Sequence, residues 1–371
     1  MKKLLCGFAL FLASANAISQ KYEFQPVKDI PCEPVISQDA TGTCWSFSTT
    51  SFLEAEILRK TGKHVDLSEM YNVRHTYPKK VYNYVMRQGH AQFGEGGLSH
   101  DVIYSAKEFG LMPQSAYSGL TPGSDKYNHQ QLEKELEEVA KKNATSKSPD
   151  AAQWKAEVST ILDKYMGVEP ADFTFEGKKY TAKSFLEMTK LDLSDYVTIT
   201  SFTQSPFYSN FILDIPDNFA YGSFYNLPLD EFVKNIDNAL EKGYTLALDT
   251  DVSEPTFSGK AGVAVLPENT ADAAAILSEI KPEKNVTQEF RQHEYENFDT
   301  QDDHLMHIVG KVKDQKGNLY YKVKNSWGTD AKSVANGGFV YMSVPYLKLK
   351  AISVMVHKDG LLPATKKALK I

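Results

Sequence analysis

Apolar residues recur with helical spacing in the first third of the chain. This spacing predicts one helix over residues 44–60, closed by Gly62, and another over residues 100–109, closed by Gly110. A Gly-rich turn at residues 94–97 lies between them. The first part of the chain is therefore predicted to fold as a mostly helical lobe.

Strand patterns predominate from residue 244 onward. Alternating and β-branched positions predict strands over residues 244–249, 304–313, 319–325 and 338–343. Turn sequences at residues 314–318 and 336–338 separate the later strands. Because short turns join antiparallel neighbours, this part of the chain is predicted to form an antiparallel lobe.

Residues 124–228 differ from both of these parts. They contain long charged segments of helical pattern, such as residues 130–143, followed by mixed apolar stretches. We interpret this region as a helical insertion. The whole pattern predicts an α+β fold of two lobes, with one domain over residues 18–371.

Composition limits the class of protein. Of the 371 residues, 42% are apolar and 24% are charged, which is typical of a folded chain with a large core. The formal net charge is −6 and no long basic face is present, so nucleic acid is not expected as a partner. Peptide or protein partners fit this balance better.

The N-terminus has the pattern of a secretory signal over residues 1–17. Lys2 and Lys3 precede an apolar run at residues 4–13, and the small residues Ala15-Asn16-Ala17 follow. The apolar run is too short to span a bilayer and no second one follows it. We expect a mature chain that begins near Ile18, is exported to the periplasm or the extracellular space, and is not inserted in the membrane.

Few cysteines remain after the predicted cleavage. Cys6 lies within the signal, which leaves Cys32 and Cys44. One pair in a chain of this size does not form a disulfide framework. Pairing is conceivable, but it would consume the residue that the local sequence marks as reactive. We interpret both as free thiols, with Cys32 structural.

Cys44 opens the predicted helix of residues 44–60. The positive end of a helix and a nearby imidazolium both lower a thiol pKa, which favours the nucleophilic thiolate. An isolated cysteine at this place could also be a small buried apolar residue. Gln38 precedes it by six residues, where its amide could point, with the backbone N–H of Cys44, at the oxyanion of a tetrahedral intermediate.

Two further segments contain residues suited to assist a thiol. In the strand that begins at His304, the alternation places His304 and His307 on opposite faces, so only one of them can face Cys44. Asn325 ends the next predicted strand, where its amide oxygen can accept an imidazole N–H. Trp327 follows and can shield that hydrogen bond from water. Each residue also has a purely structural interpretation, since asparagine is common in turns and tryptophan is common in hydrophobic cores.

Together these segments resemble the papain-like cysteine peptidases. The motifs that carry the resemblance are, in chain order, Gln38 with Gly42-Thr43-Cys44-Trp45-Ser46-Phe47, the Gly96-Gly97 pair, Asp303-His304, and Asn325-Ser326-Trp327-Gly328. The insertion and the segments 221–226, 257–260 and 304–306 are similar to the bleomycin hydrolase and aminopeptidase C branch. The likeness runs from about Val27 to Pro363.

The resemblance implies a papain-like fold with the site between a helical lobe and a β-rich lobe. It implies that Cys44 is the nucleophile, His304 its proton partner, Asn325 the residue that orients the histidine, and Gln38 an oxyanion donor. His304 is preferred to His307 because it follows Asp303 and lies six residues before Gly310, as in the family.

The resemblance also implies how substrate and subunits are arranged. Gly96 and Gly97 would bind the backbone of a peptide substrate, beside Trp327 and Asp303. Aminopeptidase action on oligopeptides, no cofactor and a homo-oligomer, a hexamer in this branch, are expected.

Several alternatives stay open at this point. The chain ends in a basic segment, residues 366–371, unlike the arm that restricts this branch to free N-termini, so an endopeptidase with an open cleft is one alternative. A papain-fold binding protein without turnover and a cysteine acyltransferase are others. A metal site could be built from His293, Asp302, Asp303, His304 and His307, although the chain has no second motif of standard ligand spacing.

Overall fold

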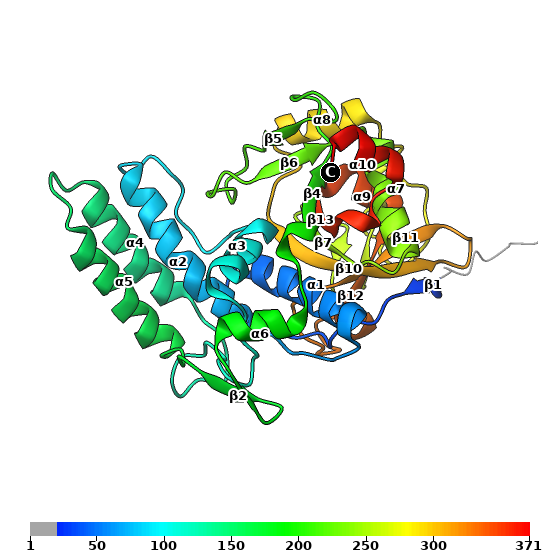
Figure 1. Cartoon of the computed structure of the whole chain (residues 1–371). Helices are drawn as coiled ribbons and strands as arrows, with labels where there is room; N and C mark the ends of the chain where they lie inside the picture. The colour runs from blue at the N-terminus through cyan, green and yellow to red at the C-terminus, as the bar shows by residue number, and fades with distance from the viewer. Residues whose placement is uncertain (1–20) are drawn as a thin grey trace, which may run out of the picture.

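The helices of residues 44–189 gather on one side of the molecule, and most strands lie on the other side together with the later helices (Figure 1). The computed structural model describes residues 21–371, so the predicted signal at residues 1–17 and Cys6 lie outside the described residues. Among residues 21–371, no helix is both long enough and apolar enough to cross a membrane.

The helical lobe is built around α1, which is buried over most of its length. Thr43 precedes it, and its carbonyl accepts from the N–H groups of Ser46 and Phe47. Gly62 ends the helix with φ +69°, a conformation that glycine adopts without strain. The predictions of helices over residues 44–60 and 100–109 are confirmed. The helices of this lobe are α1 (Cys44–Thr61), α2 (Glu69–Met86), α3 (Ser99–Phe109), α4 (Gln130–Ala144), α5 (Ala151–Met166) and α6 (Ala182–Thr189).

The α4–α5 pair forms a projecting helical hairpin beside α2 (Figure 1). The charged pattern of α4 leaves one apolar stripe, in which Leu132 and Leu136 are fully buried. Trp154 and Val158 of α5 are buried in the same core. A two-stranded ribbon of β2 (Phe173–Phe175) and β3 (Lys178–Tyr180) follows the hairpin.

The other lobe is an eleven-stranded sheet in which β10 pairs with β7, β11 and β1. Most neighbours are antiparallel, as predicted, but β4–β6 and β9–β12 are parallel. The strands are β1 (Gln25–Asp29), β4 (Tyr196–Thr200), β5 (Asn210–Ile212), β6 (Ser223–Asn226), β7 (Leu246–Thr250), β8 (Phe257–Ser258), β9 (Val263–Ala264), β10 (His304–Lys313), β11 (Leu319–Lys324), β12 (Phe339–Ser343) and β13 (Ala351–His357).

The second part of the expected insertion differs in structure from the first. Its helical part ends at Thr189, and β4, β5 and β6 then join the main sheet. The reason is packing, because β4 pairs with β13 and its Ile199 is fully buried among residues of the sheet lobe. Residues 196–226 are therefore structurally part of the sheet lobe rather than a helical addition to it.

The two lobes meet where α1 packs against β10. Ser48 of α1 donates a hydrogen bond to the carbonyl of Met306, with 2.6 Å between the two oxygens. The rest of the sheet lobe is completed by the helices α7 (Leu229–Glu241), α8 (Gln288–Glu296), α9 (Val344–Lys350) and α10 (Pro363–Leu369). This packing brings the start of α1 close to the start of β10.

Candidate active site

Cys44 is the first residue of α1 and is only 7% exposed. Both described cysteines, Cys32 and Cys44, are free thiols. The backbone N–H of Leu305 lies close enough to this thiol to lower its pKa, which places Cys44 beside the start of β10. Its own N–H belongs to the first turn of α1, where amide groups have no partner within the helix.

His304 and Asn325 come from the ends of neighbouring strands, β10 and β11. His304 Nε2 lies 2.8 Å from Asn325 Oδ1, and the N–H of Ser326 donates to the same oxygen. An amide oxygen can only accept, so His304 carries its proton on Nε2. Nδ1 is then the nitrogen available to a thiol. The next residue, Leu305, is the one whose backbone lies near the Cys44 thiol and lowers its pKa.

Burial favours the uncharged form of both groups. It raises the pKa of the Cys44 thiol to about 12, against the hydrogen bond from Leu305, and the charges of Asp217 and Asp302 raise this pKa further. Burial also lowers the pKa of His304 to about 4, while its bond to Asn325 opposes that shift. Both shifts favour the neutral thiol and the neutral imidazole.

Gln38 links the loop before α1 to the segment after β11. Its Nε2 donates to the carbonyl of Thr41 over 2.7 Å, and its Oε1 accepts from the Ser326 hydroxyl over 2.6 Å. A primary amide has two N–H groups, so one remains for a substrate oxyanion. These contacts hold the side chain in one orientation, and its oxyanion role remains a prediction.

Trp327 and Asp303 flank the histidine. The Trp327 ring centroid lies 5.1 Å from that of His304, and 39% of Trp327 is exposed. Trp327 is thus placed to cover the histidine and to contact a ligand. Asp303 Oδ1 accepts from the N–H of Val252 over 3.0 Å, so this carboxylate has a structural partner.

The Gly94–Gly97 turn is anchored to the segment around Cys44. The carbonyl of Glu95 accepts from the Trp45 indole over 3.0 Å, and the Glu95 carboxylate accepts from the N–H of Gly42. A Cβ at Gly97 would lie 3.1 Å from the Trp45 ring, so glycine lets the turn approach closely. Gly96 and Gly97 therefore lie next to the start of α1.

Lys80 is a residue that the sequence pattern did not single out. It is 7% exposed, and its ammonium donates to the carbonyls of Gly94 and Gly96. A lysine in an amphipathic helix with charged neighbours ordinarily indicates a solvated face, so the sequence carries no signal for this role. Through these two hydrogen bonds, Lys80 fixes the position of the Gly94–Gly97 turn.

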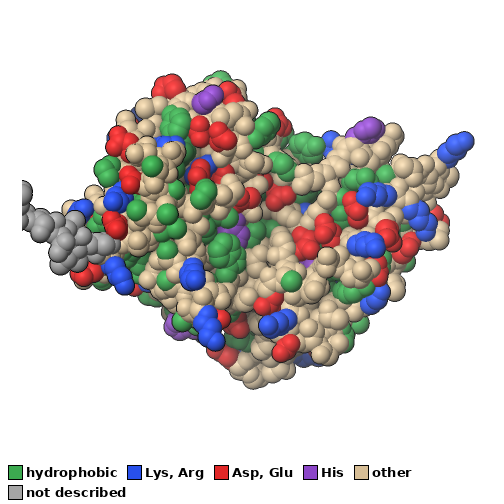
Figure 2. All heavy atoms as spheres, turned by 180° about the vertical axis from the view of Figure 1, so that it is seen from behind, with side chains coloured by type: hydrophobic (Ala, Val, Ile, Leu, Met, Phe, Trp, Pro, Cys, Tyr) green, Lys and Arg blue, Asp and Glu red, His purple; other side chains and the backbone are tan. Residues whose placement is uncertain are grey.

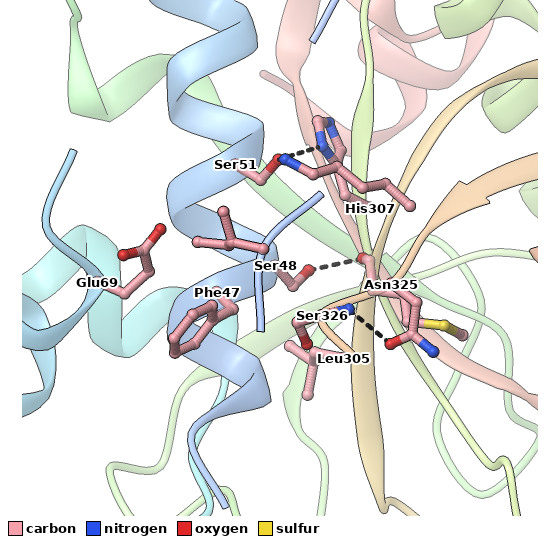
Figure 3. Close-up of a pocket in the computed structure, with 11 residues that line it drawn as sticks. Phe47, Ser48, Ser51, Glu69, Leu305, His307, Asn325 and Ser326 are labelled. Atoms are coloured by element: carbon pink, nitrogen blue, oxygen red, sulfur yellow. Dashed lines mark hydrogen bonds between the residues drawn. The ribbon is translucent and has the colours of Figure 1, made fainter. Parts of the chain in front are cut away.

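His307 is separate from the His304–Asn325 pair. Its Nδ1 lies 3.0 Å from Ser51 Oγ of α1, and Lys324 donates to the same hydroxyl over 2.7 Å. Figure 3 shows His307 pointing toward Ser51, while Asn325 lies beside Ser326 farther along the sheet. Among residues 21–371, no group of three His, Cys, Asp or Glu side chains could hold a metal ion.

Comparison with known proteins shows that this chain is similar to peptidases. A family model described as the peptidase C1-like family matches residues 91–370, which include Gly96, Gly97, His304 and Asn325 but not Cys44. Aminopeptidase G from Lactobacillus delbrueckii subsp. lactis is 25% identical over 384 residues, covering 90% of this chain and 83% of that protein.

Two further proteins are similar to part or most of this chain. Human cathepsin L2 (Homo sapiens) is 34% identical over 84 residues, which cover 23% of this chain and 22% of that protein. The crystal structure of PepW from Lactobacillus rhamnosis aligns with a TM-score of 0.73 at 19% identity, covering 93% of this chain and 84% of that one. The second similarity establishes a shared fold over nearly the whole chain.

Proposed function

Because the chain belongs to the peptidase C1-like family, we propose that this cysteine-type peptidase acts as an aminopeptidase on oligopeptides. One observation carries the proposal: the 2.8 Å contact between His304 Nε2 and Asn325 Oδ1 leaves Nδ1 for Cys44 at the start of α1. Similarity to aminopeptidase G over most of both chains supports action at a free N-terminus.

The reaction is acyl transfer through a thioester. The Cys44 thiol gives its proton to His304 Nδ1, and the sulfur attacks the carbonyl carbon of the scissile bond. The free N–H of Gln38 and the backbone N–H of Cys44 stabilise the oxyanion. His304 then protonates the leaving nitrogen, the C–N bond breaks, and the peptide lacking its acyl residue departs.

Water completes the cycle. His304, neutral again, takes a proton from water as it attacks the thioester carbonyl, and the C–S bond breaks to release the acid. Asn325 keeps the ring and its tautomer in place through both steps. Backbone groups of Gly96 and Gly97 bind the substrate strand, and Trp327 and Asp303 line the histidine side of the site.

Mass spectrometry of peptide digests tests the proposal. The purified chain is incubated under reducing conditions with matched peptides bearing free or acetylated N-termini, alongside the variants Cys44→Ala and Cys32→Ala. We expect residues to be released from free N-termini, with full activity in Cys32→Ala and none in Cys44→Ala. Cys44-dependent internal cuts in acetylated peptides would instead identify an endopeptidase.

A complete lack of Cys44-dependent cleavage, with the thiol reduced, would contradict peptidase action. The acyltransferase and the binding protein would then be the functions to test. Adding an amine acceptor distinguishes these two, because only an acyltransferase transfers the acyl group to it.

We also infer export and oligomerisation for this peptidase. The pattern of residues 1–17 supports a cleaved signal and a periplasmic or extracellular enzyme, so its substrates would be peptides outside the cytoplasm. N-terminal sequencing of the protein recovered outside the cytoplasm should begin near Ile18. The family resemblance supports a homo-hexamer, and light scattering of the purified protein measures the number of subunits.

A further inference from the structure

The loop between β5 and β6, residues 213–222, is held together by hydrogen bonds among its own residues. Its Asn218 side chain donates to the carbonyls of Leu213 and Gly222 and accepts from the N–H of Gly222, all within 2.8–2.9 Å. Leu213 is fully buried and Asn218 is 5% exposed. We call residues 213–222 the closing loop. These bonds hold it in one conformation.

The closing loop is fastened to the helical lobe. Its Phe219 ring lies 4.7 Å from the ammonium of Lys80, the residue that supports the glycine turn. Its Tyr221 ring lies 4.2 Å from the guanidinium of Arg87, the residue that follows α2. Gly222 packs so closely on the His100 ring of α3 that a Cβ there would collide with it.

The closing loop is also fastened to the sheet lobe. The Tyr295 hydroxyl of α8 donates to the carbonyl of Asp214 over 3.0 Å. The backbone of Asp217 lies near the carboxyl group of Asp302, two residues before His304, and lowers its pKa. The loop therefore spans the cleft from the glycine turn on one wall to the catalytic histidine strand on the other.

Asp217 projects from this loop onto Gly96. A Cβ on Gly96 would collide with the Asp217 carboxylate, so only glycine leaves room for it. The negative charge of Asp217 also raises the pKa of the Cys44 thiol. None of the residues that the structure describes donates a hydrogen bond to this carboxylate, since the nearby Lys80 ammonium is used on the carbonyls of the glycine turn.

The chemistry of the proposed reaction defines which part of a substrate meets Asp217. The leaving nitrogen must lie at His304 to be protonated, so the acyl part extends from Cys44 in the other direction, along Gly96 and Gly97. Asp217 and the closing loop lie across that path. A peptide that continued past them would collide with the loop, whereas an α-ammonium would meet a free carboxylate.

We propose that the closing loop blocks the acyl side of the cleft and that Asp217 binds the α-ammonium of the substrate, which makes the enzyme an aminopeptidase. This inference rests on the proposed function and explains its specificity through a loop inside the chain. The C-terminal residues described here lie elsewhere, because Thr365 of α10 bonds to Asn235 of α7 and Ile371 packs on the core around that helix.

The surroundings of Asp217 suit a cation. Asp302 has both carboxylate oxygens buried, with no hydrogen-bond partner for them among the described side chains, and Asp249 beside it is 2% exposed. Figure 2 shows acidic side chains along the hollow between the two lobes. An ammonium in this place would meet the Asp217 carboxylate and the buried oxygens of Asp302, while the Lys80 ammonium nearby is held at the carbonyls of the glycine turn.

Steady-state kinetics on paired peptides tests the proposal. One peptide has a free N-terminus, and its partner carries the same sequence after an N-acetyl group. For Asp217→Asn we expect KM for the free peptide to rise by about 10- to 100-fold with kcat changed less than about threefold, since one charged hydrogen bond is lost. Asp217→Glu should restore most of the affinity.

Asp214→Asn is the matched control, with the same chemical change in the same loop. Asp214 is exposed, and the structure uses only its backbone carbonyl. Its kinetics should match those of the wild type. A thermal melt of each variant shows whether a loss comes from unfolding, which would lower activity on both peptides alike rather than on the free peptide alone.

A shortened closing loop, with residues 214–221 replaced by two glycines, gives a second test. We expect this variant to gain cleavage of the acetylated peptide. The inference is overturned if the wild type cleaves both peptides equally well, or if Asp217→Asn leaves KM for the free peptide within about twofold. These results differ from a failure of the proposed function, in which no cleavage would depend on Cys44.

Discussion

The His304–Asn325 pair and the closing loop face the same cleft but are built in opposite ways. His304 begins β10 and Asn325 directly follows β11, so the pairing of these two strands brings the two side chains together at 2.8 Å. The closing loop lies far from both in sequence and reaches the cleft only because β4, β5 and β6 join the sheet beside β13. The proposed chemistry thus depends on the pairing of two strands, and the proposed specificity on the wider topology.

The two regions also differ in which property of their residues matters, the functional group or the shape. The pair needs particular functional groups, because an imidazole and an amide oxygen have no equivalents there. Most of the closing loop needs only shape, which Asn218 and Gly222 supply through backbone bonds. Substitutions in the pair should therefore impair the reaction on every substrate, whereas substitutions in the loop should change which substrates react.

The largest effect is expected for His304→Ala. Without a proton partner the thiolate is not formed and the leaving amine is not protonated, so kcat/KM should fall by about 10⁴-fold or more on every peptide. Stopped assays on free peptides measure it. His293→Ala, an exposed histidine on α8, is the matched control and should keep full activity. Substantial activity in His304→Ala would remove this residue from the mechanism.

A smaller loss is expected for Asn325→Ala. The ring of His304 keeps its place in the strand but loses the acceptor that fixes its tautomer, so kcat should fall by about 10²-fold. Asn325 acts through the histidine, so the pH profile of kcat/KM should shift as well. If the profile were unchanged and only thermal stability fell, its role would be structural.

A more modest effect is expected for Lys80→Met, which tests the link between the two regions. The substitution keeps the apolar stem but removes the ammonium that binds Gly94 and Gly96 and packs on Phe219. The glycine turn should loosen and KM should rise by about 10-fold, with kcat nearly unchanged. Lys155→Met, with an exposed lysine of α5, is the control. Equal kinetics in both variants would contradict this support.

The smallest effect concerns stability and pH at the buried pair Asp249 and Asp302. Burial, and then the charge of Asp217, raises the pKa of Asp302 to about 7, and burial raises that of Asp249 too. Because the folded pKa values are raised, the stability from these protons is complete below about pH 4 and is lost as the pH rises toward 7. The wild type should be destabilised progressively over that range.

Asp249→Asn removes one of the two charges and should reduce this loss. The variant should be more stable than the wild type at pH 8 by about 1–2 kcal/mol, a difference that vanishes near pH 4. Thermal unfolding at a series of pH values measures it, and the Tm difference should grow with pH. A variant that is less stable at every pH would show that repulsion between these two carboxylates does not destabilise the folded protein.

Local sequence alone predicted the elements that hold the chemistry. Periodicity and the glycine at position 62 predicted α1 within one residue of its end, and Cys44 is its first residue. Alternation predicted β10 over its full length, and the structure gives its two histidines different partners, Asn325 for His304 and Ser51 for His307. These features follow from spacing along one helix or one strand, which the sequence specifies directly.

Long-range packing decided the rest. Residues 196–226 read as part of a helical insertion, because short strands at a sheet edge have no clear period of their own, and their pairing with β13 appears only in the fold. In the same way, Lys80 and Asp217 look like solvated charges in the sequence. Both lie at the glycine turn because α2 and the closing loop converge there. Lys80 is buried beneath the turn and the Asp217 carboxylate packs on Gly96, and neither placement can be read from the local sequence.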